Sequence, residues 1–162
     1  QLATVLNVYG EEEGWDVYRD MLENFVLSES SSAVPRFVND GEQAVGITLE
    51  DNAYRYVAGG GPVKIVYPED GTTAAPDGIA LIKDGPNPEV AKRFIDWALS
   101  KSTQDFLVET MGRRPVRTDG AVPGDLPPLS EISTVPYDFE WSANNKERFV
   151  ERWTGMVQAL GL

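Results

Sequence analysis

Three short segments of this chain hold the side chains best suited to bind a small molecule. Residues 28–32 offer a run of serine hydroxyls, residues 48–51 end in two adjacent carboxylates, and residues 113–117 carry three arginines. Hydroxyl and guanidinium groups donate hydrogen bonds to anionic oxygens. Carboxylates instead suit an ammonium group, sugar hydroxyls or a hydrated cation. The sequence therefore predicts a polar or charged ligand.

The serine segment enters a short helix predicted over residues 33–39. Hydroxyls and free backbone N–H groups at such a point are well suited to an anionic oxygen. The same residue type is preferred as a helix N-cap when no ligand is present. Both interpretations stay open, and Ser30, Ser31 and Ser32 are candidate ligand-binding residues.

The carboxylate segment follows a buried strand predicted over residues 44–48. In α/β sheets ligands bind beyond the carboxyl ends of the strands, so Thr48, Glu50 and Asp51 are candidate ligand-binding residues. A helix dipole also favours carboxylates in its first turn without any ligand. If a metal is bound, the two carboxylates are the residues expected to hold it, because oxygen ligands suit hard ions.

The arginine segment supplies the expected cations. Guanidinium groups fork onto phosphate or carboxylate oxygens, so Arg114 and Arg117 are candidate anion ligands, with Arg113 beside them. The alternative for each is a surface ion pair in a strongly acidic protein. The turn at residues 67–72 adds Tyr67, Asp70 and Thr72 as weaker candidates, since its sequence also makes a good structural turn.

Composition narrows the classes of function. The 162 residues include 26 acidic and 14 basic side chains, a net charge of −12. This charge argues against nucleic acid or an anionic membrane surface as a partner, and it is otherwise explained by solubility. The absence of Cys and His excludes disulfides, thiolate metal sites and a Ser-His-Asp triad. We expect no enzymatic activity, and no run is apolar enough to span a membrane.

The elements that must position these residues alternate along the chain. Helical spacing predicts helices over residues 1–9, 12–24, 33–39, 50–58, 88–99, 101–111 and 144–160. Short apolar runs predict strands over residues 25–27, 44–48, 63–67 and 78–82. Asn87, Ser100 and Gly112 are expected to cap or end helices. The alternation predicts an α/β fold with a mostly parallel central sheet flanked by helices.

A series of segments carries a family resemblance that covers nearly the whole chain. It runs through residues 40–48, 63–72 and 76–83, then through residues 86–107, and ends in Gly112-Arg-Arg-Pro-Val-Arg117. The order and spacing of these segments resemble the C-terminal half of bacterial extracellular solute-binding proteins. These are the type 2 periplasmic binding proteins of ABC importers, and the resemblance is to their ferric-iron and phosphorylated-solute branch.

The resemblance implies a lobe of the type 2 periplasmic binding fold and a division of the chain. Residues 1–76 would form most of lobe two, residues 77–118 the hinge strand and helices of lobe one, and residues 119–162 a connection and a helix returning to lobe two. The helical spacing at the first residues and the length typical of the family both indicate a fragment of a longer protein. Helices separated from their lobe would expose apolar surface, so a homodimer of the fragment is expected.

The implied function is capture of a small solute in an interlobe cleft, followed by docking on an ABC permease in the membrane. The protein would be periplasmic or extracellular, and membrane-associated if it is a lipoprotein. The alternative is a ligand-sensing or enzymatic domain built on the same two-lobe fold.

The ligand is expected to be an anionic or phosphorylated organic solute, with ferric iron as the other possibility and no cofactor certain. In the ferric-binding branch, paired tyrosines ligate iron at the places that Glu50 and Asp51 hold here. The family's equivalent of Pro115-Val-Arg117 lies at the cleft rim, which makes Arg117 the best single anion ligand.

Overall fold

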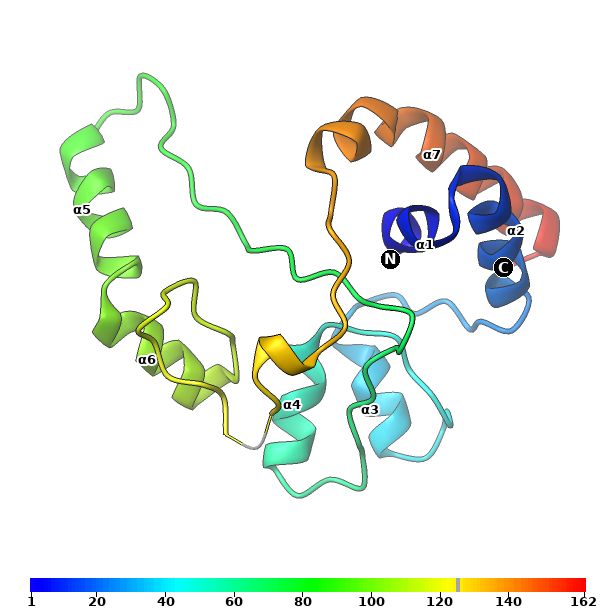
Figure 1. Ribbon diagram of the computed structural model, residues 1–162, viewed down its shortest axis with the longest axis horizontal. Helices are drawn as coiled ribbons and strands as arrows, with labels where there is room; N and C mark the ends of the chain where they lie inside the picture. Colours follow the sequence, from blue (N-terminus) through cyan, green and yellow to red (C-terminus); the bar gives the residue numbers. More distant parts are fainter. Residues whose placement is uncertain (125) are drawn as a thin grey trace. The chain divides into compact units, whose positions relative to one another are not determined.

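The computed structural model describes residues 1–124 and 126–162 (Figure 1). These residues form seven α-helices and the short 3-10 helix η1 (Leu129–Glu131). They divide into two compact units, each discontinuous in sequence. Unit 1 comprises residues 1–29, 67–75 and 130–162, and unit 2 comprises residues 30–66 and 76–129.

Unit 1 is built from α1 (Leu2–Tyr9), α2 (Glu11–Leu22) and α7 (Phe139–Leu160), which lie side by side in Figure 1. Leu6, Trp15 and Phe149, one residue from each helix, form its buried core. The rings of Trp15 and Phe149 meet edge to face with centroids 6.0 Å apart. Burial of these apolar side chains, rather than helix propensity, holds the three helices together.

The remaining segments of unit 1 are held to each other and to α1 by polar contacts. Thr72 forms an isolated parallel bridge with Thr134, in which the Thr72 N–H donates to the Ser133 carbonyl at 2.9 Å. The Tyr9 hydroxyl donates to a carboxylate oxygen of Asp70 at 2.6 Å. This hydrogen bond to a carboxylate, together with its negative charge, raises the pKa of Tyr9.

Unit 2 contains α3 (Ala33–Asn39), α4 (Glu50–Ala58), α5 (Pro88–Ala98) and α6 (Lys101–Met111). Helix α3 packs on α4, and both α4 and α5 contact α6. Each helix is short, so its stability depends on these contacts and on its caps. Because α4 contacts both α3 and α6, the candidate site residues at the ends of these helices lie in one unit.

Several predicted helix ends are confirmed. Ser100 caps α6, its hydroxyl accepting from the Thr103 N–H at 3.3 Å, and Gly112 ends that helix with a φ of 65°. Asn87 occupies the N-cap position of α5, with Pro88 as the first helical residue as predicted, although its side chain makes no cap hydrogen bond. The prediction that the last helix starts at residue 144 was wrong. It starts at Phe139, because the Asp138 carboxylate accepts from the Trp141 N–H at 2.8 Å.

The predicted α/β fold with a mostly parallel central sheet is wrong for this structure. No sheet occurs in the described residues, and the segments at 25–27, 44–48, 63–67 and 78–82 form no strand ladder. A strand is stable only when a neighbouring strand satisfies its backbone groups. These segments find no such partner here. Val45 and Ile82 accordingly remain 81% and 80% exposed.

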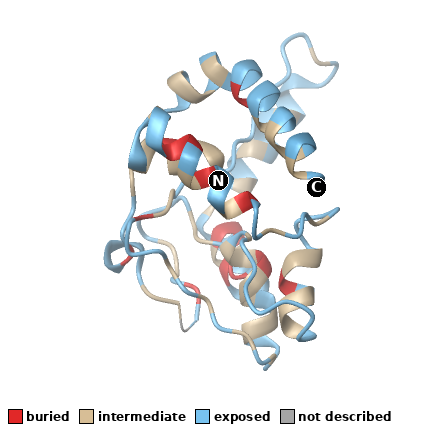
Figure 2. Ribbon diagram, turned by 90° about the vertical axis from the view of Figure 1, so that its right-hand side faces the viewer, coloured by how far each residue is buried: buried red, intermediate tan, exposed pale blue. Residues whose placement is uncertain are grey.

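Buried residues are most numerous in α2 and α6 (Figure 2). Helix α5 has no buried residue, and its apolar side chains Val90, Phe94 and Trp97 are exposed. Within residues 1–124 and 126–162, no helix is both long enough and apolar enough to cross a membrane. Assignment of the two units to the lobes of a binding protein stays a prediction.

Candidate functional site

The serine and carboxylate segments meet in unit 2 through a backbone contact. The Thr48 hydroxyl donates to the Ser31 carbonyl at 3.3 Å, across seventeen positions of sequence. Within the serine segment, the hydroxyl oxygens of Ser30 and Ser32 lie 2.9 Å apart, and the Ala33 N–H donates to the Ser30 hydroxyl at 3.3 Å. The serines therefore lie beside the segment that leads into α4, and Ser30 contributes to the start of α3.

The two carboxylates at the start of α4 are both engaged by arginines that follow α6. Arg114 donates to Glu50 from Nε at 2.8 Å and from Nη2 at 2.9 Å. Arg113 donates from Nε to Asp51 at 3.0 Å and from Nη1 to Asp77 at 2.7 Å. Two predicted ligand residues, Glu50 and Arg114, thus bind one another in this structure, and a third, Asp51, binds Arg113.

Tyr54 explains how closely the segment after α6 approaches α4. A side chain at Gly112 would collide with the Tyr54 ring, and one at Gly124 would collide with its hydroxyl. Only residues without a Cβ allow this approach, and the positive φ of 65° at Gly112 also favours glycine. The two glycines therefore allow the arginine segment to reach the start of α4.

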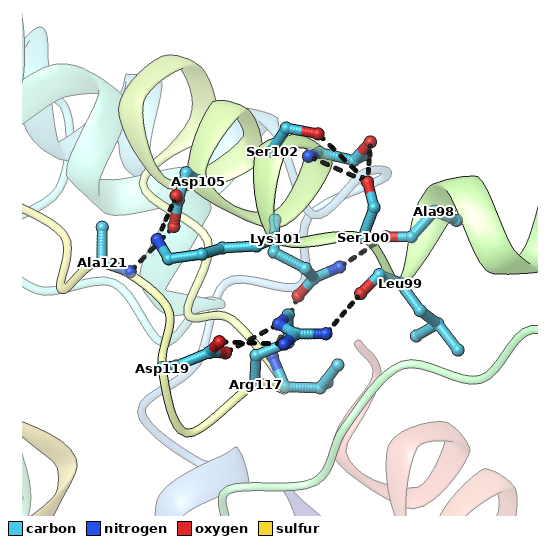
Figure 3. A network of polar contacts seen from close by, with 12 residues as sticks. Ala98, Leu99, Ser100, Lys101, Ser102, Asp105, Arg117, Asp119 and Ala121 are labelled. Atoms are coloured by element: carbon cyan, nitrogen blue, oxygen red, sulfur yellow. Dashed lines mark hydrogen bonds and ion pairs between the residues drawn. The ribbon is translucent and has the colours of Figure 1, made fainter.

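Arg117 does not pair with α4 but with a carboxylate two residues further along the chain (Figure 3). Its guanidinium forks onto the Asp119 carboxylate, from Nε at 2.7 Å and from Nη2 at 2.9 Å, and Nη1 donates to the Leu99 carbonyl at 3.3 Å. Hydrogen bonding and charge from Asp119 raise the pKa of Arg117, and Arg117 in turn lowers the pKa of Asp119. Binding of an anion by Arg117 would require it to leave Asp119.

A second set of contacts holds the same segment against the α5–α6 corner (Figure 3). The buried Gln104 side chain donates to the Ala98 carbonyl at 2.8 Å and accepts from the Val116 N–H at 3.0 Å. The Asp105 carboxylate accepts from the Ala121 N–H at 3.0 Å. These bonds position the backbone that carries the arginines.

A cavity of about 240 Å³ lies in unit 2, between α3 and α4. Its lining residues are Ser32, Pro35, Asn52, Arg55 and Tyr56. The Arg55 guanidinium donates from Nη2 to the Asn52 side-chain oxygen at 2.6 Å, and Asn52 is only 9% exposed. Of the predicted site residues, Ser32 alone lines this cavity.

The structure thus brings most of the predicted site together in one unit. Ser30–Ser32, Thr48, Glu50, Asp51 and Arg114 form one connected region of unit 2. The weaker candidates Tyr67, Asp70 and Thr72 belong to unit 1. Whether any of these residues binds a ligand stays a prediction.

Sequence reasoning missed the residues of α4 that line the cavity. Asn52, Arg55 and Tyr56 occupy one side of this helix, while Glu50 and Tyr54 occupy another. Spacing of three and four residues would have grouped them, because residues at that spacing share a helix face.

The carboxylates near the start of α4 are the residues predicted to hold a metal ion, if one binds. Within the part of the chain that the structure describes, no group of three or more His, Cys, Asp or Glu side chains could hold a metal ion. Glu50 and Asp51 supply two carboxylates, each already paired with an arginine. A ferric ion at this position would have to displace both guanidinium groups and find further oxygen ligands.

Comparison with known proteins identifies the family. A protein of Haemophilus influenzae, described only as an uncharacterized protein, is 27% identical to this chain over 163 residues. The match covers 97% of the chain but 47% of the relative, so the chain spans about half the length of that curated protein. No solved structure matches significantly. Residues 2–140 match the family described as bacterial extracellular solute-binding protein, and the chain therefore belongs to that family.

Proposed function

We propose that this chain is part of the substrate-binding component of an ABC importer, which captures a small solute outside the cytoplasm and delivers it to a membrane permease. Family membership over residues 2–140 supports this role. The observation that carries the proposal at the level of residues is the region of unit 2 in which the serine segment contacts Thr48 and the carboxylates that follow Thr48 bind two arginines. The location would be periplasmic or extracellular.

The proposed ligand is an anionic or phosphorylated organic solute rather than bare ferric iron. Arginines and hydroxyls donate to anionic oxygens, and the site region contains several of both. The carboxylates that a ferric ion would need are held in ion pairs by Arg113 and Arg114. An anionic group could instead take the place of Glu50 on Arg114 without leaving a guanidinium unpaired.

A binding role is proposed in preference to catalysis. The chain has no His or Cys, which removes the commonest general base and the thiolate nucleophile. The site region instead offers guanidinium groups and hydroxyls, which are donors suited to recognition of an anionic solute. Hinge closure around a solute would then supply the signal to the permease.

The test is native mass spectrometry of the full-length gene product, isolated without added solute. A retained small anion would support the proposal, and calorimetric titration with that anion would then give the dissociation constant. Titration with ferric citrate is the control for iron. A full-length protein that lacks an export or lipoprotein signal and captures no solute would overturn the proposed function.

Self-association is a separate proposal. We expect the exposed apolar side chains of α5 to be buried against a second copy of the chain. These side chains are Val90, Phe94 and Trp97. Light scattering over a concentration series tests it. A mass that stays monomeric at every concentration would contradict self-association and leave the solute-binding role untouched.

A further inference from the structure

The dipeptide Asp-Gly recurs along this chain. It occurs at Asp40-Gly41, Asp70-Gly71, Asp77-Gly78, Asp84-Gly85 and Asp119-Gly120. In such a pair the backbone nitrogen of the glycine can attack the side-chain carboxyl carbon of the aspartate, because glycine has no Cβ to obstruct the approach. The attack closes a succinimide ring, and it needs a carboxyl group that is free to turn toward the main chain. Since the dipeptide is the same at every position, its surroundings decide where the reaction occurs.

Most of these aspartates are held by a side chain that donates a hydrogen bond to the carboxylate. The donors are Asn39 for Asp40 at 3.0 Å, Tyr9 for Asp70 at 2.6 Å, Arg113 for Asp77 at 2.7 Å, and Arg117 for Asp119 at 2.7 and 2.9 Å. Each of these bonds must break before the carboxyl carbon can reach the glycine nitrogen. Arg117 also lowers the pKa of Asp119, which leaves less of the neutral carboxylic acid from which water can depart.

Asp84 is the exception. It is exposed, and its side chain forms no hydrogen bond or ion pair with any residue that the structure describes. Its φ of 58° also makes it the one residue other than glycine, within residues 1–124 and 126–162, that has a left-handed backbone. This conformation is strained for an L-residue, because it brings Cβ close to the following carbonyl oxygen. The carboxyl group of Asp84 is therefore unrestrained, and the main chain beside it is strained.

The attacking nitrogen, that of Gly85, is held only loosely. Its N–H donates to the Ile82 carbonyl at 3.3 Å, which is longer than the usual distance of about 2.9–3.0 Å. Residues 76–84 are all exposed, and residues 76–87 run into α5 without belonging to a helix or a strand ladder (Figure 1). The Gly120 N–H has an equally long bond of 3.4 Å, but there Asp119 is held by Arg117. The free carboxylate is thus what distinguishes Asp84-Gly85.

We propose that Asp84-Gly85 is a site of spontaneous covalent modification, at which the peptide bond migrates from the α-carbonyl to the side-chain carbonyl of Asp84. The Gly85 nitrogen forms a bond to the side-chain carboxyl carbon, and the amide proton leaves with a carboxyl hydroxyl as water. A second water then opens the succinimide. Its attack at the α-carbonyl carbon breaks the original peptide bond and leaves an isoaspartyl residue, whereas its attack at the side-chain carbonyl restores aspartate. Water is the only other reactant.

The modification changes the connection that enters α5. An isoaspartyl linkage adds a methylene to the main chain and leaves the α-carboxylate as a free group, so the net charge is retained. The bond from the Gly85 N–H to the Ile82 carbonyl cannot keep its geometry across the longer linkage. Asn87 and Pro88, which begin α5, follow shortly after this point. The inference goes beyond the proposed function and needs no ligand.

The test incubates the 162-residue chain at neutral pH and physiological temperature for several weeks. Peptide mapping with electron-transfer fragmentation, which distinguishes the two linkages, measures the isoaspartyl fraction at every Asp-Gly pair. We expect the fraction at Asp84 to grow severalfold faster than at any of the other pairs. Asp84→Glu should abolish it, because the longer side chain must close a larger and less favourable ring. A fraction at Asp84 no greater than that at Asp119 would overturn the inference.

The same incubation in urea is the control for intrinsic reactivity. In the unfolded chain no side chain holds the aspartates, so the pairs should react at similar rates. The lead of Asp84 should therefore appear only in the folded chain. If Asp84 leads equally in urea, its neighbours in sequence set the order, and the structural argument is overturned.

Arg113→Gln tests whether a held carboxylate protects its pair. This variant releases Asp77, so conversion at Asp77-Gly78 should rise by up to about fivefold, the factor that an exposed ion pair is worth. Arg93→Gln removes an exposed arginine of α5 and is the matched control, with no change expected at Asp77. Circular dichroism establishes that both variants keep their helices. If Asp77 converts no faster in a folded Arg113→Gln chain, the free carboxylate does not explain the reactivity of Asp84, and the inference is overturned.

Discussion

Arg114 and Glu50, sixty-four positions apart in sequence, are joined by two parallel hydrogen bonds of 2.8 and 2.9 Å. Arg114 also donates to the Pro127 carbonyl at 2.8 Å. The side chains of Arg114 and Glu50 are only 19% and 23% exposed, so water screens this pair less than a surface pair. The contact ties the first turn of α4 to the segment that follows α6.

Removing either partner of this pair is expected to destabilise unit 2. Arg114→Gln and Glu50→Gln should each lower the free energy of unfolding by about 1–2 kcal/mol, because the two charge-assisted hydrogen bonds of a partly buried pair are lost. The double variant should cost less than the sum of the two single variants. Urea unfolding followed by circular dichroism measures all three.

The exposed pair of Lys92 and Glu89, at 2.8 Å on α5, is the matched control. Lys92→Gln should change the free energy of unfolding by less than about 0.5 kcal/mol, since exposed pairs at this helical spacing contribute little. If the double variant lost as much free energy of unfolding as the two single variants together, Arg114 and Glu50 would not stabilise the fold as a pair.

The contacts around Arg117 predict that the free energy of unfolding falls at low pH. Lys101 and the Ala121 N–H lower the pKa of Asp105, and Arg117 lowers the pKa of Asp119. Because both folded-state values lie below the unfolded values, the unfolded chain binds protons more tightly on acidification. The stabilisation is complete above the unfolded pKa of about 3.9, and it is lost as pH falls through the folded values.

Carbon-detected NMR titration of the two carboxyl groups checks this expectation directly. Both midpoints should lie below about 3.9. In Asp105→Asn and Asp119→Asn, the loss of stability on acidification below the unfolded pKa of about 3.9 should be smaller than in wild type. A carboxyl midpoint at or above the unfolded value would show that the pair does not favour the charged form.

Local sequence signals were sufficient for most helices. The segment 33–39 forms α3 with the predicted bounds, and Gly112 adopts the left-handed conformation expected of a helix end. Capping residues and helical spacing act within one or two turns, so the sequence of the helix itself contains them. Even so, Asp138 was overlooked as the cap of α7, and that helix was predicted too short.

The strands could not be established in the same way. Residues 44–48 and 78–82 have the composition of strands, but a ladder needs a partner that sequence composition does not specify. Helix hydrogen bonds close within the element, whereas strand hydrogen bonds depend on the rest of the fold. This difference explains why the helices were predicted well and the parallel sheet was not observed.

The candidate site was predictable in its residue types but not in its pairing. The sequence predicts these residues as separate candidates, and the structure brings them into contact. Thr48 contacts Ser31, Glu50 binds Arg114, and Asp51 binds Arg113. Arg117 was ranked first, yet Asp119 two residues later binds it in this structure. Which carboxylate reaches which guanidinium depends on how the chain folds back, and nothing in the sequence spacing specified it.

The core of unit 1 provides a test of burial. Trp15 is fully buried against Phe149, with the Arg152 guanidinium 4.5 Å from its ring centroid. Trp15→Ala should cost about 3–5 kcal/mol in the free energy of unfolding, because it removes a large ring and leaves a cavity. Trp97→Ala, at a position that is 58% exposed, should cost less than about 1 kcal/mol. Urea unfolding compares the two.

A conservative variant at the same position separates packing from polarity. The Trp15 indole N–H is buried and has no hydrogen-bond partner in the described structure. Trp15→Phe keeps an aromatic ring and removes this unsatisfied donor, so its cost should be clearly below that of Trp15→Ala. Equal losses for Trp15→Ala and Trp97→Ala would contradict the core described for unit 1.

The glycine at the end of α6 permits a close approach of that helix end to Tyr54 on α4. Gly112 and Gly161 both have left-handed backbones, with φ of 65° and 72°. An added Cβ at Gly161 meets open space, whereas one at Gly112 would collide with the Tyr54 ring. Gly161→Ala should therefore cost only backbone strain, about 1 kcal/mol. Gly112→Ala should cost about 1–3 kcal/mol more, through overpacking against Tyr54.

Urea unfolding of both variants measures the difference, and a Tyr54→Ala background isolates its cause. Without the Tyr54 ring, Gly112→Ala should retain only its strain and become comparable to Gly161→Ala. The ring approaches Gly112 because Arg113 and Arg114, the next two residues, reach back to α4. Equal costs for Gly112→Ala with and without Tyr54 would mean that backbone strain alone accounts for the glycine, and that the arginine segment does not depend on this contact.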